Sequence, residues 1–220
     1  MWKKSFRQSE NMDTLEYIAK KFGIRDLQPS RIEIPDVGRN NLAHLFRELG
    51  FLRGVEVGVR EGKFSEILCM ANPEAEIFGV DPYSPYRDFE EWITTDNHHA
   101  AKRSATRRLA PYNWKLLEMT SLQAADLLRN GNPIDFVYID ADHDQKYVAE
   151  DIEAWSKVVR SGGIMSGHDW GDYRPLIGVK RAIQAYVRKN KVGPVFLFGR
   201  KNVGAGEFRE RYRSWMWVNP

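Results

Sequence analysis

The sequence predicts a doubly wound α/β fold, in which a mostly parallel sheet carries helices on both faces. Apolar segments with strand character alternate with helix-like segments from residue 55 to residue 191, and such alternation builds parallel sheets with right-handed crossovers. The segment 134–142 begins as an apolar run that suits burial on both faces. Two last apolar segments, 194–199 and 214–218, have no helix between them, which predicts an antiparallel hairpin at the edge of the sheet.

Composition supports one sizeable core. The chain has 220 residues, of which 42% are hydrophobic and 29% charged, with a net charge of +3. We expect an N-terminal helical extension over 1–39 and one larger domain over 40–220. No apolar run is long enough to cross a membrane, and the N-terminus lacks the apolar core of a secretory signal. The single cysteine, Cys69, cannot form an internal disulfide, so we expect a cytoplasmic protein.

Periodicity and turn residues give the expected elements. Residues 15–22 form a helix that Asp13 can cap and Gly23 stops, and an irregular connection with two prolines follows over 24–36. The other expected helices are 40–49, 64–71, 98–110, 121–130, 146–160 and 179–191. The expected strands are 55–59, 76–81, 114–119, 134–142, 163–170, 194–199 and 214–218.

A glycine-rich turn follows the first of these strands, and we expect a ligand to lie against it. The strand contains Glu56, and the chain then turns through Gly58 and Gly62 into the helix 64–71. Glycine has no Cβ, so a ligand can approach the backbone closely, and the helix N-terminus presents free N–H groups. The spacing matches neither the dinucleotide motif GxGxxG nor a phosphate-binding P-loop. A purely structural turn is the alternative.

Asp81 ends the next strand and narrows the class of ligand. A carboxylate at this place can accept hydrogen bonds from both ribose hydroxyls of an adenosine-containing ligand. The alternative is that Asp81 only opens a turn with Pro82. Together with the glycine turn, Asp81 predicts an adenosine-containing ligand.

A second group of polar residues ends two further strands. Asp140, Asp142 and His143 follow one strand, and His168 and Asp169 end the next. The carboxyl ends of neighbouring parallel strands meet at one edge of a sheet, so these side chains can converge. Oxygen ligands with one or two imidazoles suit Mg²⁺, Mn²⁺ or another divalent ion. The alternative is a set of turn and strand-end hydrogen bonds without a metal.

Five segments over about residues 40–220 resemble the class I S-adenosylmethionine-dependent methyltransferases: VEVGVREGKFS, GVDPY, MTS, FVYIDADHDQKY and SGGIMSGHDW. The resemblance implies a Rossmann-like, seven-stranded sheet whose last strand is antiparallel. It also implies S-adenosylmethionine as the cofactor. The residues implied around it are Gly58 and Gly62 at the turn, Glu56 beneath it, Asp81 on the ribose, Met119, Thr120 and Ser121 beside the adenine, and also Asp140.

The acidic cluster resembles that of metal-dependent O-methyltransferases, including the catechol, caffeoyl-CoA and macrolide sugar types. This resemblance implies that Asp140 and Asp169 hold Mg²⁺ or Mn²⁺, and we take His168 as the third ligand. His143 stands where the catechol type has its catalytic lysine, and could accept the proton of a substrate hydroxyl. Asp140 and His143 are therefore the expected catalytic residues. The sequence departs from the catechol type at Trp170, where that type has asparagine.

We therefore expect O-methylation of a small hydroxylated acceptor with help from a divalent metal. The aromatic-rich segment 84–99 is long for a connection and is a candidate lid; a packed loop is the alternative. Trp92, Trp170 and Tyr173 are candidates for the wall of the acceptor pocket. No membrane partner is expected, and the apolar segments 194–199 and 214–218 could join subunits of a homo-oligomer.

Three other functions stay open. The first is methylation of nitrogen or of a nucleic acid through the basic segment 102–108, although no Asn-Pro-Pro-Tyr-like motif follows the fourth strand. The second is a non-catalytic binding or assembly protein that keeps the fold. The third and weakest is a metal-dependent hydroxylase.

Overall fold

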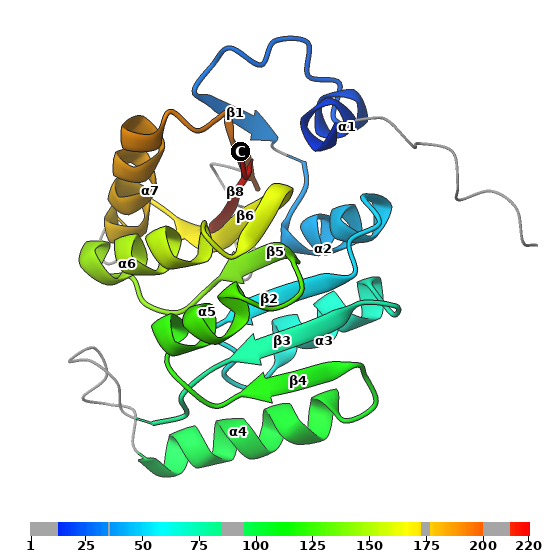
Figure 1. Cartoon of the computed structure of the whole chain (residues 1–220), viewed down its shortest axis with the longest axis vertical. Helices are drawn as coiled ribbons and strands as arrows, with labels where there is room; N and C mark the ends of the chain where they lie inside the picture. The colour runs from blue at the N-terminus through cyan, green and yellow to red at the C-terminus, as the bar shows by residue number, and fades with distance from the viewer. Residues whose placement is uncertain (1–12, 35, 85–94, 173–176, 200–211) are drawn as a thin grey trace, which may run out of the picture.

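The computed structural model describes residues 13–34, 36–84, 95–172, 177–199 and 212–220. Within this part of the chain, one eight-stranded sheet has the order β1-β7-β8-β6-β5-β2-β3-β4 (Figure 1). Its strands are β1 Arg31–Ile34, β2 Arg53–Val57, β3 Glu76–Val80, β4 Trp114–Leu117, β5 Ile134–Ile139, β6 Val159–Trp170, β7 Val195–Phe198 and β8 Arg213–Val218.

The sheet is parallel except at β8, which runs antiparallel to both of its neighbours, β6 and β7. Strand order reverses between β2 and β5, since the chain adds β3 and β4 on one side of β2 and β5 on the other. Ligands of open α/β sheets bind at such a switch point, beyond the carboxyl ends of the strands. The fold thus directs attention to the residues that directly follow β2 and β5.

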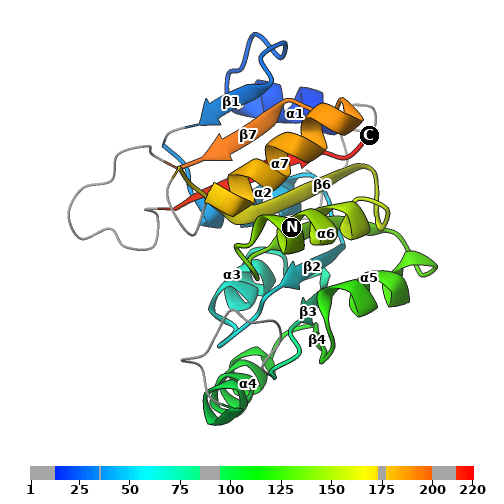
Figure 2. The same ribbon diagram turned by 90° about the vertical axis from the view of Figure 1, so that its left-hand side faces the viewer.

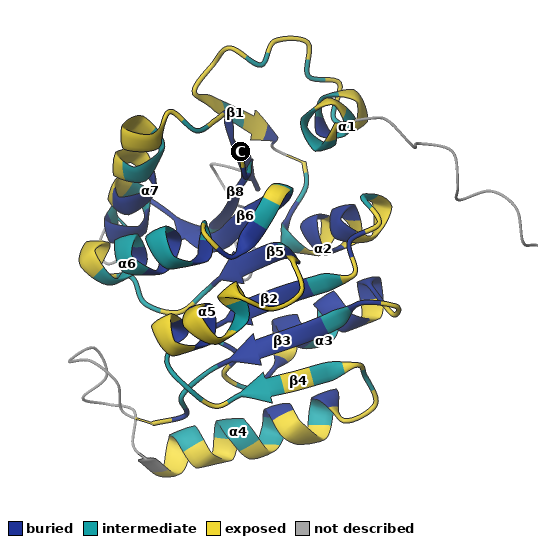
Figure 3. Ribbon diagram, viewed as in Figure 1, coloured by how far each residue is buried: buried dark blue, intermediate teal, exposed yellow. Residues whose placement is uncertain are grey.

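Seven helices cover the described sheet: α1 Thr14–Lys21, α2 Arg39–Glu48, α3 Lys63–Ala71, α4 Thr95–Leu109, α5 Ser121–Arg129, α6 Gln145–Trp155 and α7 Ile177–Asn190. Helices α1 to α4 pack into one hydrophobic cluster and α5 to α7 into another, on the opposite face (Figure 2). The central strands between them are almost wholly buried (Figure 3). These two clusters confirm the predicted doubly wound α/β fold.

Strand β1 is a correction to the sequence analysis, which treated 24–36 as an irregular connection and expected seven strands. Arg31 to Ile34 pair in parallel with Val195 to Phe198 of β7. The hairpin of β7 and β8 forms as predicted, but it does not lie at the edge, because β1 lies outside β7. A four-residue strand between two prolines has too short a pattern to detect. The predicted boundary at residue 39 stays a prediction, although β1 joins the main sheet.

The end of α6 is a second correction. The helix was expected over 146–160, yet it ends at Trp155, and β6 begins at Val159 rather than at residue 163. The side chain of Asn219 donates hydrogen bonds to the carbonyls of Ser156 and Val159, at 3.1 and 2.7 Å, where the chain leaves the helix and enters the strand. A partner so distant in sequence leaves no local signal.

The apolar strands β7 and β8 lie inside the sheet, and nearly all of their residues are buried in the core. They therefore do not present the subunit interface that their composition suggested. Cys69 is buried, as expected of a small apolar residue. Among the described residues, none of the helices combines the length and the apolar composition that a membrane crossing requires.

Candidate active site at the switch point

Gly58 joins the ends of three strands. Its φ is +93°, and a Cβ at this position would lie 2.2 Å from the carbonyl oxygen of Asp140. Its N–H donates to the carbonyl of Val80 at the end of β3, at 2.9 Å. Only glycine has both this backbone conformation and the room for this contact. The turn after β2 therefore packs directly on the residue that follows β5.

Gly62 has a different structural role. It precedes α3 with a φ of +75°, and a Cβ there would lie 2.9 Å from Leu109 Cδ1 and 3.1 Å from Ala105 Cα. The missing side chain lets α4 pack against the turn. Contact of Gly62 with a cofactor stays a prediction.

The carboxylate of Asp81 holds the loop that follows β2. Its Oδ2 accepts hydrogen bonds from the backbone N–H groups of Val59 and Arg60, at 3.1 and 2.9 Å. Its Oδ1 accepts from the N–H of Tyr83 at 2.9 Å, so the expected turn also forms. Asp81 remains half-buried at the edge of the sheet, where a ligand can reach it.

Glu56 is buried beneath the glycine turn, with 2% of its surface exposed. The hydroxyl of Ser65 donates a hydrogen bond to its Oε2. Burial raises the pKa of Glu56 to about 8, against the lowering effect of the Ser65 hydrogen bond. A proton, or a cation supplied by a ligand, is therefore needed to stabilise this carboxyl near neutral pH.

Four side chains converge at the ends of β5 and β6, and we call them the acid–imidazole cluster: Asp140, His143, His168 and Asp169. His143 Nε2 lies 2.6 Å from Asp169 Oδ2, and His168 Nδ1 lies 3.1 Å from Asp169 Oδ1. His168 Nδ1 also lies 3.7 Å from Asp140 Oδ1. Asp140, His168 and Asp169 each offer one ligand atom, and these three atoms lie within 4.8 Å of one another. The predicted convergence of these side chains is thus present in the structure.

An irregularity in β6 makes this convergence possible. Successive side chains of a regular strand point to opposite faces, so His168 and Asp169 would point apart. Asp169 instead has a φ of +62°, and the pairing of β6 with β8 shifts between Gly167 and Trp170. Both side chains consequently reach the same cluster. Backbone strain of this kind is concentrated at functional sites.

The cluster shifts the pKa values of its two carboxyl groups in opposite directions. Burial raises the pKa of Asp140 above its usual value, although the neighbouring His168 opposes this. Burial acts in the same direction on Asp169, but hydrogen bonds from His143 and His168 outweigh it and hold the pKa of Asp169 well below its usual range. Asp169 is therefore the firmly ionised member of the pair.

The imidazoles respond to the same charges. Burial lowers the pKa of His143, but the hydrogen bond to Asp169 and the neighbouring carboxylates raise it on balance. The pKa of His168 is likewise raised, because Asp140 and Asp169 outweigh the effect of its burial.

A cavity of about 10 Å³ adjoins these groups, which is about the volume that one water molecule needs.

The family model described as a methyltransferase domain matches residues 55–170, just over half of the chain. The chain belongs to this methyltransferase family. The matched region begins in β2 and ends at Trp170, so it contains both the glycine turn and the acid–imidazole cluster. A relative, the uncharacterized protein R132 of Acanthamoeba polyphaga mimivirus, is 27% identical over 158 residues. That match covers 70% of this chain and 66% of the relative, slightly less than two thirds of its length.

Solved structures agree with the family. The O-methyltransferase TomG of Streptomyces achromogenes, in complex with SAM, has a TM-score of 0.57 at 16% identity, covering 96% of this chain and 92% of TomG. An O-methyltransferase of Bacillus cereus, in complex with SAH, has a TM-score of 0.57 at 16% identity, covering 96% and 93%. At such low sequence identity, the structural likeness establishes the shared fold alone. With the family match, these structures confirm the predicted methyltransferase and its Rossmann-like fold.

The methyltransferase has a further site residue, Arg39, that sequence reasoning missed. It is the first residue of α2, and its Nη1 lies 3.5 Å from Asp140 Oδ2. Its guanidinium also lies over the ring of Phe64, 4.9 Å from the centroid. Arg39 lies just outside the region of the family match and far from Asp140 in sequence. The sequence signal for this role of Arg39 is weak, since it consists of an arginine at the start of the helix that precedes β2.

Residues 119–121 of the methyltransferase start α5. Thr120 caps the helix, accepting a hydrogen bond from the N–H of Gln123. The hydroxyl of Ser121 accepts a 2.9 Å bond from the indole of Trp155, so it faces α6. Met119 packs partly buried against the cluster of α5 to α7. Contact of these three residues with an adenine stays a prediction, and for Ser121 its backbone is the group available.

The structure also places Asp142, Trp170 and the basic helix α4, which the sequence had singled out. Asp142 Oδ1 accepts from the N–H of Asp144, which stabilises the turn before α6. Trp170 is buried beside α7 rather than facing the cluster. The basic helix α4 is partly neutralised, with Lys102 paired to Glu118 at 2.5 Å and Arg108 paired to Glu66. Most of the candidate lid, with Trp92, and also Tyr173 lie outside the described residues.

Replacing Glu56 by glutamine should make the methyltransferase more stable at neutral pH. The native carboxyl binds its proton more tightly folded, with a pKa of about 8, than unfolded, near 4.5. Stability of the native chain must therefore fall as pH rises from 4.5 to 8, on the order of a few kcal/mol, and the variant lacks this loss.

Urea unfolding at pH 5, 6, 7 and 8 measures the difference. The free energy of unfolding of Glu56→Gln should rise relative to that of the native protein at each higher pH. The free energy of unfolding of the exposed Glu74→Gln should follow the native curve. Parallel curves for native and Glu56→Gln would contradict the assignment.

Proposed function

We propose that this methyltransferase transfers the methyl group of S-adenosylmethionine to a hydroxyl oxygen of a small acceptor. One observation carries the proposal: the acid–imidazole cluster adjoins the glycine turn, because Gly58 packs on the backbone of Asp140. A cofactor held by the turn and an acceptor held by the cluster would then meet above β2 and β5. The O-methyltransferase neighbours share this fold.

The cofactor would lie over the turn between β2 and α3. Asp81 would accept hydrogen bonds from the ribose hydroxyls, since its carboxylate is half-exposed at the end of β3. Glu56 lies beneath the turn, and its raised pKa means that a nearby ammonium group of the cofactor would favour its charged form. Residues 119–121 would lie beside the adenine.

His143 would receive the proton of the acceptor hydroxyl. The methyl group would move from the sulfonium to the oxygen, which leaves a neutral thioether, and the hydroxyl proton would go to Nδ1 of His143, because Nε2 carries the proton that it donates to Asp169. Asp169, which accepts the hydrogen bond from Nε2 at 2.6 Å, would then stabilise the imidazolium. The sulfonium is already a reactive donor, so the main task of the protein is to position the two reactants.

A divalent metal fits the cluster by its donors. Two carboxylates and one imidazole lie close enough to share an ion, and they are ligands that Mg²⁺ or Mn²⁺ accepts. Asp140, His168 and Asp169 would hold it. Such an ion would lower the pKa of the acceptor hydroxyl and orient it.

Arg39 would oppose that ion. Its guanidinium already neutralises part of the charge on Asp140, and both side chains are mostly buried. Two cations near one carboxylate repel each other by several kcal/mol at the effective dielectric of a partly buried site. Arg39 and a divalent metal are therefore competitors for Asp140 in this proposal.

A direct test of the reaction is release of S-adenosylhomocysteine with matched acceptors. Phenolic or sugar hydroxyls should support release, whereas the same compounds with an amine in place of the hydroxyl should not. His143→Gln should lower the rate about 10²–10⁴-fold with little change in cofactor affinity. Methylation of the amine compounds alone would contradict the O-methyl assignment.

Asp81→Asn should weaken the binding of S-adenosylmethionine in calorimetric titration, on the order of tenfold to a hundredfold, because hydrogen bonds to a charged acceptor are lost. Thermal melting of the variant, measured in parallel, shows whether the loop still folds. The exposed Asp126→Asn is the matched control and should bind like the native chain. Native-like affinity in a folded Asp81→Asn variant would rule out the ribose role.

Arg39→Gln should bind Mn²⁺ more tightly than the native chain, on the order of tenfold, because a competing cation is removed. Binding is measured by titration calorimetry without cofactor or acceptor. Arg47→Gln changes an exposed arginine of the same helix and should match the native chain, and Asp169→Asn should abolish binding. Equal affinities for native and Arg39→Gln would show that the two cations do not compete.

A further inference from the structure

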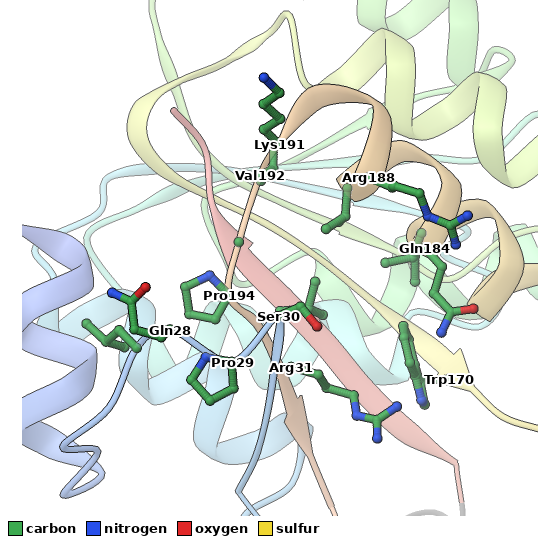
Figure 4. A pocket seen from close by; sticks show the side chains of 15 residues that line it. Gln28, Pro29, Ser30, Arg31, Trp170, Gln184, Arg188, Lys191, Val192 and Pro194 are labelled. Carbon is green, nitrogen blue, oxygen red and sulfur yellow. The ribbon is translucent and has the colours of Figure 1, made fainter.

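A second cleft lies away from the cluster, on the face of the sheet that α7 covers (Figure 4). Its volume is about 870 Å³, within the usual range of small-molecule sites. One side is formed by the second half of α7, from Ile183 onward. The other sides are the segment 27–31 that leads into β1 and the loop 191–195 that leads into β7.

The alternation of β1 explains why the cleft exists. Ile32 and Ile34 face the helices on the opposite side of the sheet and join their hydrophobic cluster. Arg31 and Glu33 therefore face the side of α7, and both side chains are exposed. A charged strand face is not buried under a helix. An open groove is consequently left between α7 and the edge strand.

The base of this groove is apolar. Ile183 and Val195 are buried there, and Val187 is half-buried. Trp170 forms one end (Figure 4), where it is 4% exposed. These groups offer an apolar surface, which suits a flat organic body.

The charged lining has a single sign. Arg31, Arg188 and Lys191 line the cleft, together with neutral polar side chains, and no aspartate or glutamate among the described residues does so. Arg31 is 3.8 Å from Glu33, and both side chains are nearly half exposed, so that pair is weak. The lining therefore attracts an anion.

We propose that this cleft binds a small organic anion, with an aromatic or otherwise apolar body against Ile183, Val187 and Trp170 and its negative group between Arg31 and Arg188. The N-terminal segment of the chain is not a suitable occupant, because residues 1–12 carry three basic side chains and one acidic side chain. The inference stands apart from methyl transfer, since it uses none of the residues assigned to that reaction.

The test uses naphthalene-2-sulfonate as the anionic probe and 2-naphthol as its neutral counterpart, in calorimetric titration at neutral pH. The native chain should bind the sulfonate at least tenfold more tightly than the naphthol, and added salt should weaken sulfonate binding. The double variant Arg31→Gln/Arg188→Gln should lose at least tenfold in sulfonate affinity.

The matched control is Arg181→Gln/Lys189→Gln, which removes the same charge from exposed positions of α7 outside the cleft. It should bind the sulfonate within twofold of the native chain. Equal sulfonate affinity in the two double variants, or equal native affinity for sulfonate and naphthol, would overturn the proposal. Titration of S-adenosylmethionine into each variant should give native affinity, so failure of the cleft is distinguishable from failure of the cofactor site.

Discussion

The contact between Gly58 and the backbone of Asp140 is the constraint on which the candidate site depends. A Cβ at residue 58 would lie 2.2 Å from the Asp140 carbonyl oxygen, so any other residue would push the turn after β2 away from the end of β5. The turn belongs to the cofactor in our proposal and Asp140 to the acceptor. The close approach of the turn to the end of β5 thus depends on one missing side chain, at the point where strand order reverses.

Charge balance is the second constraint on the site. Glu56, Asp81, Asp140 and Asp169 lie near one edge of the sheet, and the described groups that offset them nearby are Arg39 and two imidazoles. Each of these positive groups also occupies a carboxylate that a metal would need. Asp169 is ionised and bonded to His143 and His168, and Asp140 is paired with the guanidinium of Arg39. A cationic cofactor therefore has a favourable electrostatic environment, whereas a metal has to compete for its ligands.

Local patterns were enough to predict much of this protein. Glycines spaced between a strand and a helix, carboxylates at strand ends and alternating periodicity predicted the sheet, the turn and the cluster. What the sequence missed depends on distant partners. Strand β1 is defined by pairing with β7, the start of β6 by Asn219, and the role of Arg39 by Asp140. Ser121 shows the opposite case, because a motif position predicted beside a ligand carries a hydroxyl that bonds a core indole.

The end of β6 connects the two sites of the molecule. Asp169 turns through a left-handed conformation to join His168 in the cluster, and the chain then carries Trp170 to the other side, where it closes the cleft beside α7. Lys180 of α7 lies over the Trp170 ring, 5.9 Å from its centroid, which ties the helix to this turn. One short segment, in which Asp169 has a left-handed backbone conformation, thus supplies neighbouring side chains to both places.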